Sequence, residues 1–140
     1  VPVIHCGGLP TILPMMLFEQ TDPSHLRTYQ EKRDLVEREQ KYRLVPFEGS
    51  EWAPKIAEYT KIMAGIFFPF DYGRFEFRLD ERNGKLHMLE VNLNCNLWSQ
   101  KVFGKSAELV GWSHADLIET ILCESLLRQG LITQAEAVAA

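Results

Sequence analysis

Two strand-like segments joined by a short polar turn constrain the fold of this chain more than any other feature. Residues 72–79 read Tyr-Gly-Arg-Phe-Glu-Phe-Arg-Leu, and residues 86–92 read Leu-His-Met-Leu-Glu-Val-Asn. Both segments are rich in aromatic and aliphatic residues that alternate with polar ones, which is typical of half-buried strands. The turn between them contains Asn83 and Gly84, a pair that favours tight hairpin loops. The pattern therefore predicts an antiparallel β-hairpin.

The hydrophobic pattern selects the register of this hairpin. A two-residue loop of Asn83 and Gly84 would put Glu76 and Glu90 on opposite faces. A three-residue loop that also includes Arg82 pairs Glu76 with Glu90 instead. A slip of one residue would mix the apolar and polar sets, so we predict the three-residue loop. In this register one face of the hairpin is largely apolar and consists of Phe75, Phe77, Leu79, His87, Leu89 and Val91.

The opposite, polar face of the predicted hairpin suggests a metal site. Two carboxylates directly opposite each other repel, and a bound cation is the simplest relief. Glu76, Glu90 and Asn92 offer the oxygen ligands that Mg²⁺ prefers. Magnesium held in this way usually serves phosphate chemistry. The alternative interpretation is that Glu76 is a surface carboxylate paired with Arg74 or Arg78.

The rest of the sequence predicts a single α+β domain over residues 1–140, an antiparallel sheet with flanking helices on one face. Further strands are expected at 1–6, 12–18 and 42–47. Helices are expected at 51–67 with Ser50 as N-cap, at about 105–110, and from Ser113 to Gly130, with a helical or frayed tail. The charged stretch 26–40 is either a solvated helix or loop, or a mobile loop over a phosphate site with Lys32 pointing inward.

Composition excludes several functional classes. The formal charge of −4 argues against a nucleic-acid partner bound by bulk electrostatics. No apolar run is long enough to span a bilayer, and no segment reads as a signal peptide. Cys6, Cys95 and Cys123 show no C-x-x-C spacing, so free thiols in a reducing, cytoplasmic compartment are expected. Cys95 follows the acidic strand and is expected to be a small loop residue.

Several motifs resemble the C-terminal part of ATP-grasp ligases, with the D-alanine–D-alanine ligases and their relatives as the nearest group. Those enzymes carry a Gly-Arg-(apolar)-Asp strand, a turn and a Leu-Glu-(small apolar)-Asn strand. They also carry a Tyr-x-x-Lys segment upstream and a closing Gly-x-Ser helix. The matching segments here are residues 73–80, 83–84, 89–92, 29–32 and 111–118. The resemblance covers most of the chain.

The resemblance implies roles for individual residues. Glu76, Glu90 and Asn92 would ligate Mg²⁺ or Mn²⁺ ions that bridge the ATP phosphates. Arg74 would face the transferred phosphoryl group, and Lys32 would approach a phosphate. The implied reaction joins a small carboxylate to an amine. The carboxylate attacks the γ-phosphate to give an acyl phosphate, and the amine then attacks the acyl carbon.

The sequence also departs from that family. Glu76 stands where the family usually has Asp, and residues 93–96 (Leu-Asn-Cys-Asn) replace a Ser-Pro-Gly-like turn. The N-terminal lobe that supplies most of the purine pocket has no counterpart, and the chain opens directly on a strand at Val1. We therefore expect a fragment or processed piece that is inactive alone and is completed by its missing N-terminal lobe, with a homodimer as one possible assembly. The alternative is a non-catalytic interaction or structural domain derived from such a lobe.

Overall fold

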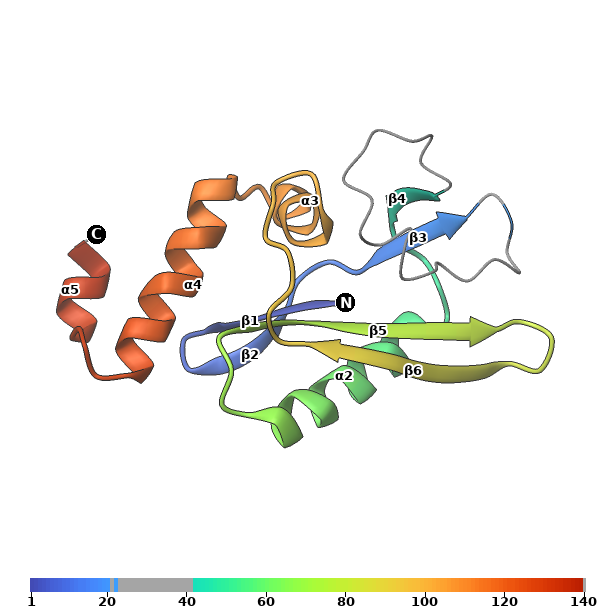
Figure 1. Ribbon diagram of the computed structural model, residues 1–140, viewed down its shortest axis with the longest axis horizontal. Coiled ribbons are helices and arrows are strands. Elements are labelled where there is room, and N and C mark those ends of the chain that lie inside the picture. The colour runs from blue at the N-terminus through green and yellow to red at the C-terminus, as the bar shows by residue number, and fades with distance from the viewer. Residues whose placement is uncertain (21, 23–41, 140) are drawn as a thin grey trace.

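The computed structural model describes residues 1–20, 22 and 42–139 (Figure 1). Its main sheet has four antiparallel strands in the order β2-β1-β5-β6. Their bounds are β1 (Pro2–Cys6), β2 (Leu9–Ile12), β5 (Tyr72–Asp80) and β6 (Lys85–Asn92). A second antiparallel sheet pairs β3 (Met16–Gln20) with β4 (Tyr42–Pro46). The predicted α+β class, an antiparallel sheet with flanking helices, is therefore confirmed.

The helices cover both faces of the main sheet, so the prediction of helices on one face is wrong. In Figure 1, α2 (Ala53–Phe67) lies on one side, and α3 (Val102–Leu109) and α4 (His114–Arg128) lie on the other, with α5 (Gln134–Ala139) beyond α4. The cause is visible in β1. Val3 packs into the core on the α2 side, while its neighbour Ile4 packs into the core beneath α3 and α4. A strand with consecutive buried apolar residues needs cover on both faces.

The predicted element boundaries hold in part. Ser113 caps α4 as predicted, because its Oγ accepts the Asp116 N–H at 3.1 Å while the Asp116 carboxylate accepts the Ser113 N–H at 2.7 Å. Ser50 does not cap α2, which begins at Ala53 after Trp52; the Ser50 Oγ instead accepts the Trp52 N–H in a local turn. The strand predicted at 12–18 is split into β2 and β3 around Pro14, which cannot donate to a ladder.

The hairpin register is partly as predicted and partly wrong. Asp80 pairs with Lys85, so the loop has four residues, 81–84, with Gly84 at a φ of 63°. Phe77 pairs with Met88 rather than with Leu89. Leu89 has no opposite residue and forms a β-bulge, which shifts the register back by one. Glu76 therefore faces Glu90, as predicted, because the bulge offsets the longer loop.

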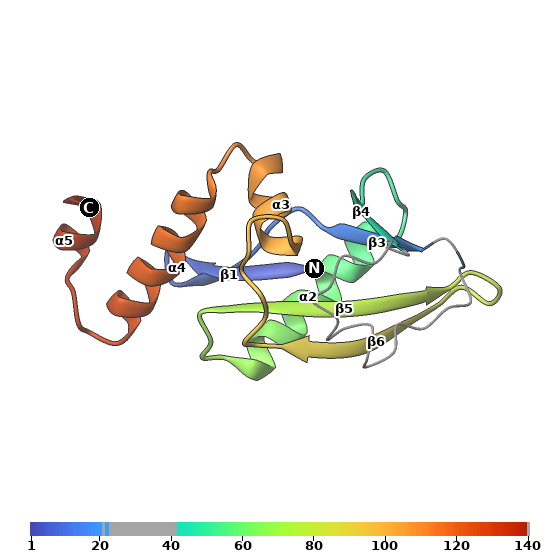
Figure 2. The ribbon, with the colours of Figure 1, turned by 45° about the horizontal axis from the view of Figure 1, so that its top comes forward.

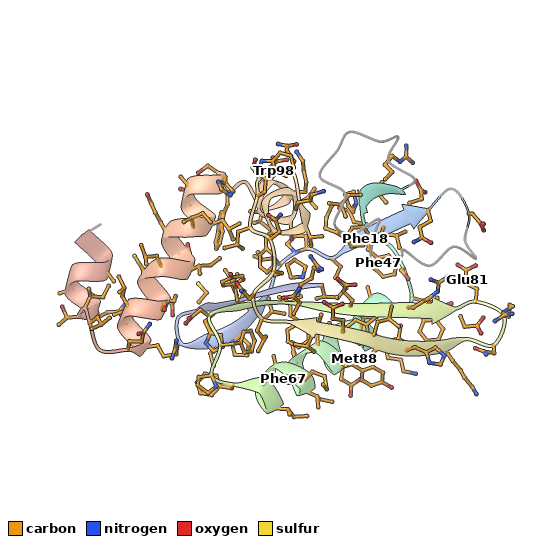
Figure 3. All side chains as sticks on the ribbon, in the orientation of Figure 1. Phe18, Phe47, Phe67, Glu81, Met88 and Trp98 are labelled. Carbon is orange, nitrogen blue, oxygen red and sulfur yellow. The ribbon has the colours of Figure 1, made fainter. Side chains whose placement is uncertain are left out.

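The bulge separates the apolar side chains of β6 from the polar ones more completely than the predicted register does. Leu86 and Met88 line an apolar cleft of about 310 Å³ against α2, together with Phe77. Figure 3 shows Met88 on the α2 side of the hairpin. His87 pairs with Arg78 on the polar face, so its predicted place on the apolar face is wrong. Leu89, predicted to be apolar-facing, is 57% exposed.

His5 is a polar residue buried at the end of β1. It is 3% exposed and lies against the rings of Phe68 and Phe70, each with its centroid 5.2 Å away. Within the part of the chain that the structure describes, its Nε2 has no hydrogen-bond partner. Burial lowers the pKa of His5 below its ordinary value of 6.5, although the carboxylates of Asp71 and Glu124 act in the opposite direction.

We expect His5→Phe to stabilise the fold, and more so in acid. At pH 8 the gain in the free energy of unfolding should be about 1 kcal/mol. Phenylalanine removes the buried, unpaired Nε2 and still places an aromatic ring at this position. Below pH 6.5 the unfolded wild type binds a proton before the folded protein does, so wild-type stability falls and the gain grows. Urea unfolding at pH 8 and pH 5 measures both values. A gain that shrinks on acidification would contradict the lowered pKa.

All three cysteines are free thiols. Among the described residues, no helix combines the length and apolar character needed to cross a membrane.

Candidate functional site

The predicted ligands meet at one end of the β5–β6 pair. Arg74 lies directly opposite Asn92, and Glu76 lies directly opposite Glu90. Residues opposite each other in such a pair share a face, with Cβ atoms about 4.5–5.5 Å apart. This face points away from α2, because the alternate residue Phe75 is buried in the core on the α2 side. The structure thus brings four of the five predicted site residues together, and Lys32 lies outside the described residues.

An ion pair joins two of these residues. The Nε–H of Arg74 donates a hydrogen bond to Oε1 of Glu76 at 2.7 Å. The Nη2 atom of Arg74 lies 2.5 Å from the same oxygen. Both side chains are largely shielded, with 20% and 23% of their surface exposed. This is the pairing that the alternative interpretation of Glu76 predicts. The positive charge offsets the repulsion between Glu76 and Glu90, so the carboxylate pair can form without a bound cation.

The donor set suits a hard cation that keeps open coordination positions. Within residues 1–20, 22 and 42–139, no three His, Cys, Asp or Glu side chains gather closely enough to form a complete metal cage. Two carboxylates and an amide oxygen are a smaller set. Magnesium is commonly held by one or two carboxylates plus substrate phosphates and water, whereas structural zinc needs four nitrogen or sulfur ligands. The residues present therefore fit Mg²⁺ or Mn²⁺.

The loop after β6 is the part of the site that the sequence interpretation missed. It crosses over β5 on its way to α3 (Figure 1 and Figure 2). Oδ1 of Asn92 accepts the Asn94 N–H at 3.0 Å, and Oδ1 of Asn96 accepts the Trp98 N–H at 2.7 Å. These side-chain turns supply the bends without Gly or Pro. Asparagine at every second position from 92 to 96 is the sequence signal for them.

Tertiary contacts fix this loop on the sheet. Cys95 is 5% exposed and belongs to the core beneath α3 and α4. Burial raises the pKa of its thiol, which keeps it protonated and fits the predicted structural role. The side chain of Leu93 lies over Gly73, where an added Cβ would be 2.8 Å from its Cδ2. The His114 ring contacts the Leu97 carbonyl oxygen at 2.7 Å.

Comparison of the chain with models of protein families gives no match, and comparison with curated protein sequences gives none either. The ATP-grasp resemblance therefore rests on the motifs and on the arrangement of Arg74, Glu76, Glu90 and Asn92, and it stays a prediction.

Proposed function

We propose that this chain is the C-terminal lobe of an ATP- and Mg²⁺-dependent carboxylate–amine ligase of the ATP-grasp type. The observation that carries the proposal is the pairing of Glu76 with Glu90, next to Arg74 opposite Asn92, on one face of the hairpin. That face combines oxygen ligands for a hard cation with a guanidinium that suits phosphate.

Each of the four residues has a role in the proposal. Glu90 and the Asn92 amide oxygen would hold Mg²⁺ or Mn²⁺, together with the Oε2 oxygen of Glu76. Arg74 contacts Oε1 of the same carboxylate, so the pair keeps the guanidinium on the ligand face. From there Arg74 would stabilise negative charge on the transferred phosphoryl group. The cation, when bound, neutralises the charge of the ATP phosphates and orients them.

The proposed reaction needs groups from outside this face. A substrate carboxylate attacks the γ-phosphate and forms an acyl phosphate with release of ADP. An amine then attacks the acyl carbon and releases phosphate. Catalysis of both steps depends mainly on positioning and electrostatic stabilisation. A further lobe of the same protein would supply most of the purine pocket, and the carboxylate and amine are small molecules.

A non-catalytic interaction or structural domain is the second candidate. The Arg74–Glu76 ion pair favours it, because both charges are satisfied without a cation. The loop at residues 93–96, which lacks Gly and Pro, points in the same direction.

Thermal unfolding with ligands separates the two candidates. We expect MgCl₂ and ATP together to raise the melting temperature more than either of them does alone. A ligand at ten times its dissociation constant stabilises the native state by about 1.4 kcal/mol. In a chain of this size that corresponds to a rise of about 3–6 °C. An unchanged melting temperature with both ligands present would favour the non-catalytic candidate.

A further inference from the structure

Two polar contacts connect β5 to the proposed ligand Asn92. The Tyr72 hydroxyl donates to Oδ1 of Asn94 at 3.3 Å. The backbone N–H of Asn94 donates to Oδ1 of Asn92 at 3.0 Å. Tyr72 lies two residues before Arg74 on β5, so both side chains are on the same face of the strand. The strand that carries Arg74 and Glu76 is thus tied, through Asn94, to the last residue of β6.

Packing holds both ends of this connection in place. The Tyr72 ring meets the fully buried ring of Phe103 edge-on, with the centroids 5.9 Å apart. Burial raises the pKa of Tyr72, which keeps its hydroxyl protonated and able to donate. At the other end, Asn94 directly precedes the buried Cys95. Packing therefore brings Tyr72 and Asn94 together, and the hydrogen bond between their side chains connects them.

The contact with Asn94 determines which end of the Asn92 amide occupies each position. The amide carries an oxygen acceptor at one end and an NH₂ donor at the other, and rotation exchanges them. Only the oxygen can accept the Asn94 N–H. A carbonyl oxygen accepts along two lone pairs, so one remains for a cation while the other is used.

We propose that Tyr72 and Asn94 are positioning residues of the metal site, which act by orienting the Asn92 amide so that its oxygen is available to a cation. Neither residue contacts the cation itself. The inference rests on the proposed function, since it takes Asn92 as a metal ligand. It adds an orienting role for Asn94, in the loop after β6, to the roles proposed for Arg74, Glu76, Glu90 and Asn92.

Tyr72→Phe tests this inference because it removes the hydroxyl and keeps the ring against Phe103. Binding is followed with Mn²⁺ alone, from the electron paramagnetic resonance signal of the free ion. We expect the dissociation constant for Mn²⁺ to rise about 10-fold, since losing a group that orients a ligand typically costs 10–100-fold in affinity. The melting temperature should stay near that of the wild type. Tyr59→Phe, in the cleft between α2 and the face of the hairpin opposite the candidate ligands, is the matched control and should bind Mn²⁺ as the wild type does.

A second background separates orientation from a general structural effect. In Asn92→Asp the two side-chain oxygens are equivalent, so rotation no longer presents a wrong end to the cation. We therefore expect Tyr72→Phe to have no effect on Mn²⁺ affinity in that background. An equal loss in both backgrounds, or no loss in either, would overturn the inference. If either of these results were found and Glu90→Gln still abolished Mn²⁺ binding, the proposed metal site would stand without the positioning role of Tyr72 and Asn94. Absence of Mn²⁺ binding by the wild-type chain would contradict the metal site and the inference together.

Discussion

Replacing Gly104 by alanine should destabilise the fold by about 3 kcal/mol. Gly104 lies in the first turn of α3, where the backbone of Ser99 runs against it. A Cβ at this position would lie 2.1 Å from the Ser99 carbonyl oxygen and 2.5 Å from its Cα. Backbone atoms cannot rotate away as a side-chain end can, so α3 or the loop before it must shift. Overpacking of this kind typically costs 1–3 kcal/mol and sometimes more.

Gly65→Ala is the matched control for this prediction. Gly65 is an exposed residue of α2, and an added Cβ would meet nothing within 4 Å. The same chemical change should therefore stabilise the protein by about 0.5–1 kcal/mol, because alanine has the higher helix propensity. Urea unfolding of the two variants measures the difference in free energy. Similar values for both would contradict the close approach of the loop to α3.

Glu90→Gln should weaken Mn²⁺ binding by at least about 100-fold. Glutamine keeps the size of the side chain and removes the charge that the cation needs. Changes to groups that only orient a ligand cost about 10–100-fold in affinity, so loss of a direct ligand should cost at least the upper end of that range. Glu76→Gln is a less informative variant, because it would leave the shielded Arg74 without its carboxylate partner. Isothermal titration calorimetry gives the dissociation constants.

Glu58→Gln controls for the loss of one negative charge. Glu58 is exposed on α2, which covers the opposite face of the sheet from the candidate ligands. Its removal changes the net charge by the same amount and should leave Mn²⁺ affinity within about twofold of the wild type, since distant surface charges are largely screened at physiological ionic strength. Equal affinities in Glu90→Gln and Glu58→Gln would mean that Glu90 is not a ligand.

The hairpin shows how far the sequence alone could lead. Alternation of apolar and polar residues was sufficient to predict both strands. Glu76 was correctly placed opposite Glu90 only because the unpredicted bulge offsets the error in the loop length. The loop length was wrong because Asn83-Gly84 fits loops of two, three or four residues. The bulge did have a signal. Leu86 and Met88 are at even positions of the strand and Val91 is at an odd one, so in a regular strand Val91 would face the opposite side. All three can face α2 only if one residue between them is left unpaired.

The remaining features depend on contacts between distant segments. The strand order β2-β1-β5-β6 places residues near the start of the chain beside residues beyond 70, and no local pattern specifies such a neighbour. The presence of helices on both faces of the main sheet could be predicted in part, because Val3 and Ile4 are consecutive apolar residues of one strand. The approach of Ser99 to Gly104 was not readable, because a glycine in a helix is compatible with many surroundings.

Anomalous X-ray scattering from crystals grown with Mn²⁺ and a non-hydrolysable ATP analogue tests the proposed metal site. We expect a manganese peak on the polar face of the hairpin, within about 2.0–2.4 Å of carboxylate oxygens of Glu76 and Glu90 and near the Asn92 amide oxygen. Phosphate oxygens of the analogue should complete its coordination. A manganese peak elsewhere, with Glu76 bound only to Arg74, would contradict the metal site and the ligase function proposed for this chain.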